Sequence, residues 1–311
     1  MQYWPRSRAR QSYARIRTWP KSKETKPLGF AGYKVGMTHL LITDNKQNSL
    51  TRGQDIFCPV TIVECPPLKT ASIRFYKNTQ DGAKLISEMV DDNIDKELER
   101  KITHPKKQGK EPSDHDFVRI LCHTQPKLTN IGKKKPEIFE IAVGGTKDQQ
   151  LSYAKEKIGK EIMISEVFKE GQLLDAHSLT KGKGFQGAVK RFGVQLRQHK
   201  SEKSRRNPGT LGPWKAQGHV MWRVAHAGKT GYHLRTEYNK WIVKIGNKPE
   251  EINSKGGFIN YGIVKNSYIL IKGSVSGNEK RLIRFTDAAR MKRELEAPTI
   301  AYTSLESKQG N

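Results

Sequence analysis

The sequence predicts a mainly β protein of the α+β class, with a few helices and with two strongly basic extensions. Three observations support this prediction. Short runs of β-branched and aromatic residues are frequent, stretches with helical periodicity are few, and the positive charge of the 311-residue chain is concentrated in two segments. Many short strands separated by turns are typical of a barrel or a sandwich, whereas alternating strand–helix units would need more and longer helices.

Eight short runs are expected to form the strands. Each is rich in Val, Ile, Phe or Tyr, most span four to eight residues, and Gly, Pro and Asn separate them, which is the usual sequence pattern of strands bounded by turns. The runs are 58–65, 70–77, 117–124, 137–145, 240–246, 258–264, 267–275 and 280–287.

Three segments are expected to be helical. The longest, 83–102, places Leu85, Met89, Ile94 and Leu98 near helical spacing. It is followed by a polar, Pro-bearing loop, and together they predict a helical and loop insert over residues 81–115. The two shorter candidates are 151–159 and 287–295.

The distribution of charge is more informative than its total. The chain has 57 Lys and Arg against 31 Asp and Glu, a formal net charge of +26. Residues 1–36 hold nine bases and one acid, and residues 181–244 hold fifteen bases and two acids, so these segments carry +21 of the total. Such an excess predicts a polyanionic partner, a nucleic acid before an anionic membrane. No apolar run approaches the ~20 residues that a membrane helix needs.

All five tryptophans lie in or next to the basic segments. Arg side chains interleaved with aromatic rings are typical of proteins that stack on bases and bind phosphates. Trp222 and Trp241 occur in apolar, strand-like runs and are interpreted as members of local hydrophobic clusters. Trp214, in a run bounded by Gly and Pro, is interpreted as a nucleic-acid contact. The other two are Trp4 and Trp19.

The basic segments are expected to be extended. The N-terminus is Arg-rich and lacks the apolar stretch of a secretory signal. An organelle transit peptide is the alternative, but its Pro and aromatic residues favour a binding arm. Residues 193–220 have little apolar periodicity and are broken by five Gly or Pro residues between 208 and 218. This segment is expected to be disordered when free, and a hairpin of this length could reach at most ~45 Å.

The motifs that partly match cofactor or metal sites all have a better non-catalytic explanation. Residues 182–187 (GKGFQG) match a dinucleotide fingerprint, but the preceding residues make a poor strand and no suitable acid follows. This glycine-rich loop, with its lysines, is expected to bind a phosphate backbone. His219, His226 and His233 are spaced too widely for a zinc site. The acids of 91–95 are interpreted as a solvated helical face. No catalytic residue, metal or cofactor is expected.

The cysteines indicate a reducing compartment. Cys58, Cys65 and Cys122 include no Cys-x-x-Cys pair, and each lies in or beside a strand-like run. They are therefore interpreted as small, apolar, buried residues that form neither a disulfide framework nor a zinc site.

One long stretch carries a family resemblance. Its constrained positions are Phe168, Asp175, Ser178, Thr180, Gly182, Lys183, Gly184, Gly187 and Arg191, and the downstream run GPWKAQGHVMWRVAHAGKTGYHLRT and the N-terminal PLGFAGYKVGMTH fit as well. With these residues the chain closely resembles the ribosomal protein L-three family of the large ribosomal subunit. Its length and insert resemble the archaeal–eukaryotic type.

The resemblance implies a structural, non-enzymatic protein of the cytoplasmic ribosome. Its expected partners are large-subunit ribosomal RNA and neighbouring ribosomal proteins, with no membrane and no small-molecule substrate. It also implies a β-barrel like that of translation proteins, an N-terminal arm, and a finger whose tip approaches the peptidyl transferase centre. Trp214 matches the finger-tip tryptophan of the family. An RNA-modifying enzyme or an architectural nucleic-acid binder with basic arms is the alternative.

The expected organisation divides the chain into seven segments. They are the arm (1–36), three barrel parts (37–80, 116–192 and 241–290), the insert (81–115), the finger (193–240) and a C-terminal helix or tail (291–311). The residues expected to contact rRNA are Arg6, Arg8, Arg10, Arg15, Arg17, Lys181, Gly182, Lys183, Gly184, Gly187, Arg191, Arg197, Lys203, Arg205, Arg206, Trp214, Lys215, His219, Arg223, Lys229 and Arg235.

Overall fold

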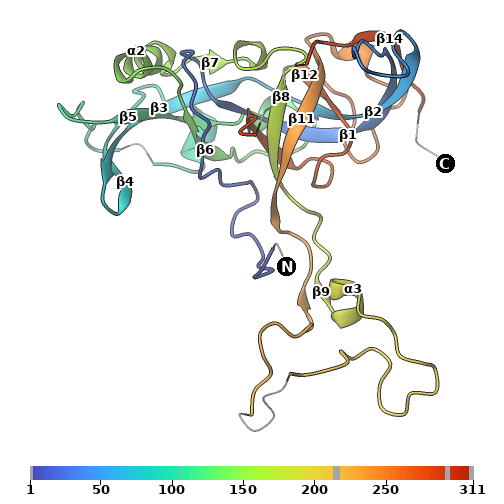
Figure 1. Cartoon of the computed structure of the whole chain (residues 1–311). Coiled ribbons are helices and arrows are strands. Elements are labelled where there is room, and N and C mark those ends of the chain that lie inside the picture. Colours follow the sequence, from blue (N-terminus) through green and yellow to red (C-terminus); the bar gives the residue numbers. More distant parts are fainter. Residues whose placement is uncertain (1–2, 104, 213–217, 291–294, 308–311) are drawn as a thin grey trace. The chain divides into compact units, whose positions relative to one another are not determined.

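The computed structural model describes residues 3–103, 105–212, 218–290 and 295–307 (Figure 1). Contacts between Cα atoms divide the chain into two compact units. Met1–Ser12 and Leu179–Arg235 form one, here called the basic unit; Tyr13–Ser178 and Thr236–Asn311 form the other, here called the core unit. The basic unit thus combines residues that the sequence analysis assigned to the arm, to the second barrel part and to the finger.

A closed ring of six strands is the centre of the core unit. In the larger sheet the strand order is β13-β8-β11-β12-β2-β1, and β1 also pairs with β13, from Gly29 opposite Thr286 to Tyr33 opposite Leu282. This last pairing closes the six strands into a barrel. The far half of β1 pairs with a seventh strand, β14. The strands are β1 Gly29–Thr43, β2 Asp55–Glu64, β8 Leu173–Leu179, β11 Leu234–Gly246, β12 Tyr268–Lys272, β13 Leu282–Asp287 and β14 Thr299–Thr303.

A second antiparallel sheet completes the core unit. Its order is β4-β3-β5-β6, and the short β7 pairs with the start of β3. Helix α2 (Lys147–Lys157) lies against β5; its N-terminus is capped by Thr146 and Gln149 in a reciprocal capping box. The strands are β3 Leu68–Thr79, β4 Gly82–Val90, β5 Phe117–His123, β6 Ile138–Ala142 and β7 Glu161–Ile162.

The remaining elements are short. The basic unit contains β9 (Phe185–Gln186), β10 (Gly228–Lys229) and helix α3 (Ala188–Phe192). The core unit has the one-turn helix α1 (Lys96–Glu99). Its 3₁₀ turns are Pro126–Leu128, Ile164–Glu166 and Pro249–Glu251.

One hydrophobic cluster joins both sheets of the core unit, and side chains from most of their strands contribute to it. Cys58, Cys65 and Cys122 are free and buried, which confirms their interpretation as apolar residues. Burial raises the pKa of the Cys122 thiol to about 12, so it stays protonated at neutral pH. The mainly β, α+β fold class is confirmed, as are seven of the eight expected strands and the helix over 151–159.

The helix expected over 83–102 is wrong. Residues Gly82–Val90 form β4, which pairs with β3 from Ser72 opposite Val90 to Thr79 opposite Gly82. The free edge of β3 offers a ladder of backbone partners, and this pairing overrides a periodicity carried by only four apolar residues. Only Lys96–Glu99 is helical. The acids of 91–95 therefore lie in a turn, where Asp95 pairs with Lys69 at 2.7 Å.

Two further expectations about local structure are wrong. Residues 258–264 form a tight turn with a single bridge between Phe258 and Gly262, because Gly257 (φ 73°) and Gly262 (φ 99°) take left-handed conformations that end a strand. The run before the glycine-rich loop, taken as a poor strand, belongs to β8. The helix expected over 287–295 falls partly on residues 291–294, outside the described residues; 288–290 lie beyond β13 without helix.

Candidate nucleic-acid interface

The basic unit has almost no acids and almost no apolar core. It contains sixteen Lys and Arg and a single acid, Glu202. Among its described residues, Leu179 and Ala188 are the buried apolar side chains. A surface of this composition cannot neutralise itself, so its cations need negative charge from elsewhere.

Two glycine–lysine motifs form the base of this unit. β9 and β10 pair antiparallel, with Lys229 opposite Phe185. The Lys183 amide donates to the Thr230 carbonyl at 2.9 Å, and the Thr230 amide donates to the Gly184 carbonyl at 2.8 Å. A Cβ on Gly231 would lie 2.0 Å from the Lys181 carbonyl oxygen. The glycines of both motifs thus allow the two backbones to approach each other closely. The predicted residues exposed on this ladder are Lys181, Gly182, Lys183, Gly184, Gly187 and Lys229.

Arg191 serves the fold of the basic unit itself. It lies on α3, and its Nη1 donates to the His226 carbonyl at 2.9 Å. Gly228 makes room for it, since a Cβ there would lie 2.7 Å from the guanidinium. Its side chain is half-buried and also approaches the Phe192 ring, 5.1 Å from the centroid. Arg191 therefore has a structural role whether or not it touches RNA.

The first residues of the chain are part of the same unit. The Ala9 amide donates to the Tyr232 carbonyl at 2.9 Å, and His233 Nδ1 bonds the Ser7 carbonyl at 2.8 Å. The Arg6 guanidinium donates to the Arg191 carbonyl. The two basic, Trp-bearing segments, which the sequence presents as separate extensions, are therefore brought together over residues 3–12.

Stacked rings and guanidinium groups hold this junction together. The Trp4 ring stacks on Phe192 with 5.5 Å between centroids and meets Trp222 edge-on at the same distance. The Arg6 guanidinium lies 4.2 Å from the Phe192 centroid, and that of Arg223 lies 5.2 Å from Trp222. Trp222 is 63% exposed. The strand-like run predicted around Trp222 is wrong, because Trp222 lies in a turn, whereas its place in a local cluster of apolar rings is supported by the contact with Trp4.

Three more predicted residues are placed in the same region. Arg8 lies 5.5 Å from the Tyr232 ring centroid and Arg235 lies 4.1 Å from that of Tyr3. Arg10 is also exposed. The aromatic partners Tyr3, Phe192 and Tyr232 were not predicted from the sequence. Two of them have a recognisable pattern, since Phe192 directly follows an Arg and Tyr232 lies within a glycine–lysine motif.

The loop after α3 carries the densest positive charge. Arg197, Lys203, Arg205 and Arg206 are exposed, and none forms an ion pair with an acid in the described part of the chain. The Arg197 amide donates to the Arg205 carbonyl at 3.2 Å, which closes the loop. A groove of about 650 Å³ lies here, with Arg197 and Arg206 in its lining and no acid. Trp214 and Lys215 lie outside the described residues; His219 and Arg223 are exposed.

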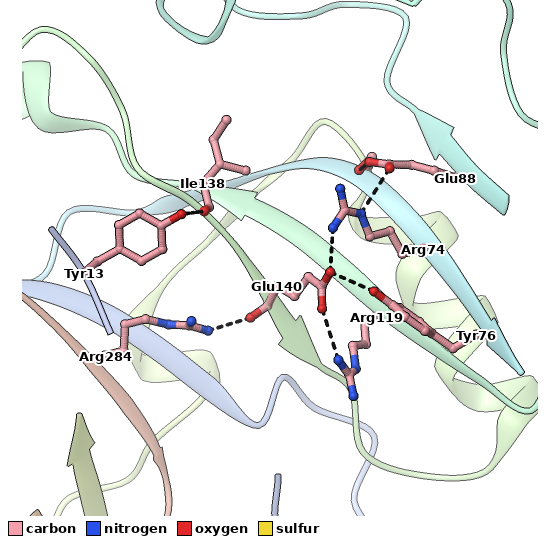
Figure 2. A network of polar contacts seen from close by, with 9 residues as sticks. Tyr13, Arg74, Tyr76, Glu88, Arg119, Ile138, Glu140 and Arg284 are labelled. Carbon is pink, nitrogen blue, oxygen red and sulfur yellow. Dashed lines mark hydrogen bonds and ion pairs between the residues drawn. The ribbon is translucent and has the colours of Figure 1, made fainter. Parts of the chain in front are cut away.

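Arg15 and Arg17 belong to the core unit. They are exposed and alternate with the buried Ala14 and Ile16, the pattern of an extended strand laid on a core. The Tyr13 hydroxyl donates to the Ile138 carbonyl at 2.7 Å and helps to hold this segment (Figure 2). The predicted arm is therefore divided between the units, with Arg6, Arg8 and Arg10 in one and Arg15 and Arg17 in the other.

The arginines of the core unit that lie on strands have partners within the fold. The Glu140 carboxylate accepts from Arg74 at 2.5 Å, from Tyr76 at 2.8 Å and from Arg119 at 3.1 Å (Figure 2). Arg284, which is 3% exposed, donates to the Glu140 carbonyl at 2.6 Å. Burial alone would raise the pKa of Glu140, but the hydrogen bonds from Tyr76, Arg74 and Arg119 lower it below its ordinary value. These cations maintain the fold.

The described residues give no support for a metal site or for a membrane-spanning helix. Within the part of the chain that the structure describes, no group of three His, Cys, Asp or Glu side chains is placed to hold a metal ion. His233 instead accepts the Gly231 amide at 3.1 Å. None of the described helices is long and apolar enough to cross a membrane.

Comparison with known proteins identifies the family. The model of the family described as ribosomal protein L3 matches residues 1–113 and 106–310. The chain is 48% identical to the large ribosomal subunit protein uL3 of Picrophilus torridus, over all of this chain and 97% of the relative. It is 46% identical to that of Methanobrevibacter smithii and 45% to that of Archaeoglobus fulgidus, over 98% of this chain and at least 95% of each relative. The chain belongs to the ribosomal protein L3 family.

Proposed function

We propose that the protein is a non-enzymatic, structural constituent of the large subunit of the cytoplasmic ribosome and binds large-subunit rRNA. The observation that carries the proposal is the composition of the basic unit, which has sixteen cations against one acid and hardly any buried apolar side chain. Folded RNA supplies the missing negative charge. The family membership and the names of the relatives support the same assignment.

The exposed cations are proposed to bind phosphates. A-form RNA has a deep, narrow groove that hides its base edges, so proteins bind its backbone, its 2′-hydroxyls and its unstacked bases. Lys183 and Lys229 are exposed on the ladder of the two glycine–lysine motifs, from which their ammonium groups are suited to phosphate oxygens. Trp222, with its exposed ring beside Arg223, is suited to stack on an unpaired base.

The cations of the predicted arm and those of the predicted finger have different settings. Arg15 and Arg17 are held on the core unit by the buried residues between them, so their guanidinium groups have a fixed base. The guanidinium groups of the loop from Arg197 to Arg206 are positioned only by hydrogen bonds within the loop itself. We propose that this loop takes its final path from the RNA, because the ordering cost can be offset by binding. The seven-segment division of the chain remains a prediction.

Sedimentation tests the proposal. A tagged copy of the chain should travel with large subunits at physiological salt. Replacement of Arg197, Arg205 and Arg206 by Gln should shift the chain toward the free fractions at moderately raised salt, because each lost phosphate contact lowers affinity. A wild-type chain that sediments free of the subunit would contradict the proposal. Turnover on purified rRNA would favour the RNA-modifying alternative.

A finer proposal concerns the finger tip. By its family resemblance, Trp214 is proposed to support rRNA near the peptidyl transferase centre. Trp214→Ala should leave the sedimentation of the chain with the subunit unchanged and slow peptidyl transfer or tRNA accommodation. Ribosomes that carry this variant and translate at the normal rate would contradict the role of Trp214 but not the assignment to the subunit.

A further inference from the structure

A groove in the core unit follows the last described residues of the chain. Two cavities, of about 350 and 220 Å³, share Ile252 in their lining. Ile300–Thr303 lines the first, and Ser304 and Glu306 line the second. Because consecutive residues of one segment line both, the cavities form successive parts of one surface groove. It is here called the C-terminal groove.

Large apolar side chains are exposed along the C-terminal groove. Ile259 is 48% exposed and Met37 is 38% exposed in the lining of the second cavity; Tyr302, in the first, is 47% exposed. Leu305, between two lining residues, is 44% exposed. Apolar side chains gathered around a concave surface mark an interaction site more often than the same side chains scattered singly.

The charge of this groove is opposite to that of the chain. The lining contains Glu251, Glu279 and Glu306 against one base, Lys244, whose ammonium pairs with Glu251 at 2.6 Å. Lys255 and Lys280, although near these residues in sequence, line neither cavity. In a protein of net charge +26, an acidic, apolar groove is unsuited to a phosphate backbone, because like charges across an interface cost several kcal/mol.

We propose that the C-terminal groove binds an extended, Lys- and Arg-rich segment of a neighbouring protein of the same subunit, which rests on the proposed function. Apolar side chains of that segment fill the two cavities, and its cations face Glu306. Strand β14 pairs on one side with β1, but its ladder shifts register at Ala301. This bulge disfavours regular addition of another strand, so side chains provide the recognition.

Photo-cross-linking in assembled subunits tests this inference. The photoreactive residue p-benzoylphenylalanine is placed at Ile259 or Tyr302, and at Leu50 as the control, a fully exposed residue in a turn of the core unit that lines neither cavity. Large subunits that contain the tagged chain are purified and irradiated, and the adducts are identified by mass spectrometry. Both groove positions should cross-link to the same Lys- and Arg-rich protein segment. Glu306→Lys should lower that yield at least threefold, and Glu306→Gln less.

The possible outcomes separate this inference from the proposed function. Adducts with rRNA, with a second copy of the chain or with its own C-terminus would overturn the inference, as would yields no higher than at Leu50. Each of these results leaves the assignment to the subunit intact if the chain co-sediments with large subunits. A chain that is absent from the subunits would overturn both.

Discussion

Arginines of the same chemistry have opposite roles in the two units. Arg74 and Arg119 of the core unit share the Glu140 carboxylate, whereas Arg205 and Arg206 of the basic unit are exposed and form no ion pair with an acid in the described residues. We expect a cation with an internal partner, whether an acid or a carbonyl, to maintain the fold, and an exposed cation without an acid to be available to a polyanion. We therefore expect exposure and the internal partner, rather than the density of Lys and Arg in the sequence, to distinguish structural from RNA-binding cations.

The largest expected effect is on the core unit. Glu140→Ala removes the acceptor of three hydrogen bonds and leaves the half-buried Arg119 guanidinium without its acid, while Arg74 keeps only Glu88 at 3.1 Å. Loss of one partner from such a pair costs about 3–5 kcal/mol when buried, and we expect about 3 kcal/mol here. Urea denaturation should show this loss, whereas Glu156→Ala, an exposed control on α2, should change stability by less than about 0.5 kcal/mol. Equal effects would mean that the network does not stabilise the core unit.

The second effect depends on pH. Burial, together with the nearby Arg284, lowers the pKa of His177 to about 4, and its ring bonds Thr236 at 3.0 Å and Thr286 at 3.1 Å. As pH falls from 6.5 to 4, the unfolded chain binds a proton at His177 that the folded chain does not. Stability should therefore decrease over this window, by at most about 3 kcal/mol. His177→Gln should flatten the dependence and His199→Gln, an exposed control, should not; an unchanged slope in H177Q would exclude His177 as its source.

A smaller effect is expected at the junction within the basic unit. Trp4→Ala removes one stacked and one edge-on ring contact, each worth about 0.5–1.5 kcal/mol. We expect the basic unit to open more often and trypsin to cleave faster after Arg191, which is half-buried and held by the His226 carbonyl in the closed unit, by roughly tenfold for about 1.4 kcal/mol. Leu50→Ala serves as the control in the core unit. Cleavage at the wild-type rate in W4A would show that residues 3–12 are dispensable for this unit.

The sequence predicted the strands whose own residues show a continuous or alternating apolar pattern. Alternating or continuous apolar runs such as 58–65 and 117–124 became strands because they are buried on one or both faces. It failed at β4, where the decisive partner is the edge of β3 and not the residues of β4 themselves. Their apolar residues Leu85 and Ile86 remain about 40% exposed, so burial could not have indicated the strand.

The candidate interface could be located from the sequence but not assembled. Charge counts found the cations of both basic segments, including Arg197 and Lys229. They could not show that Trp4 meets Phe192 and Trp222, because contacts between residues 188 and 218 positions apart leave no local pattern. Nor could they show that Arg191 is engaged by the His226 carbonyl. Exposure and partner, which separate RNA-binding from structural cations, are properties of the fold.

The central claim is that RNA affinity resides in the cations of the basic unit, and salt dependence tests it most directly. The affinity of the chain for a large-subunit rRNA fragment is measured from 50 to 300 mM salt. The double variant Arg205→Gln/Arg206→Gln should reduce the slope of log affinity against log salt by about 1.4–1.8, since each phosphate contact contributes about 0.7–0.9. Lys106→Gln/Lys107→Gln, which removes two exposed lysines of the core unit, should leave the slope unchanged. Equal changes in both double variants, or none in the first, would contradict the account.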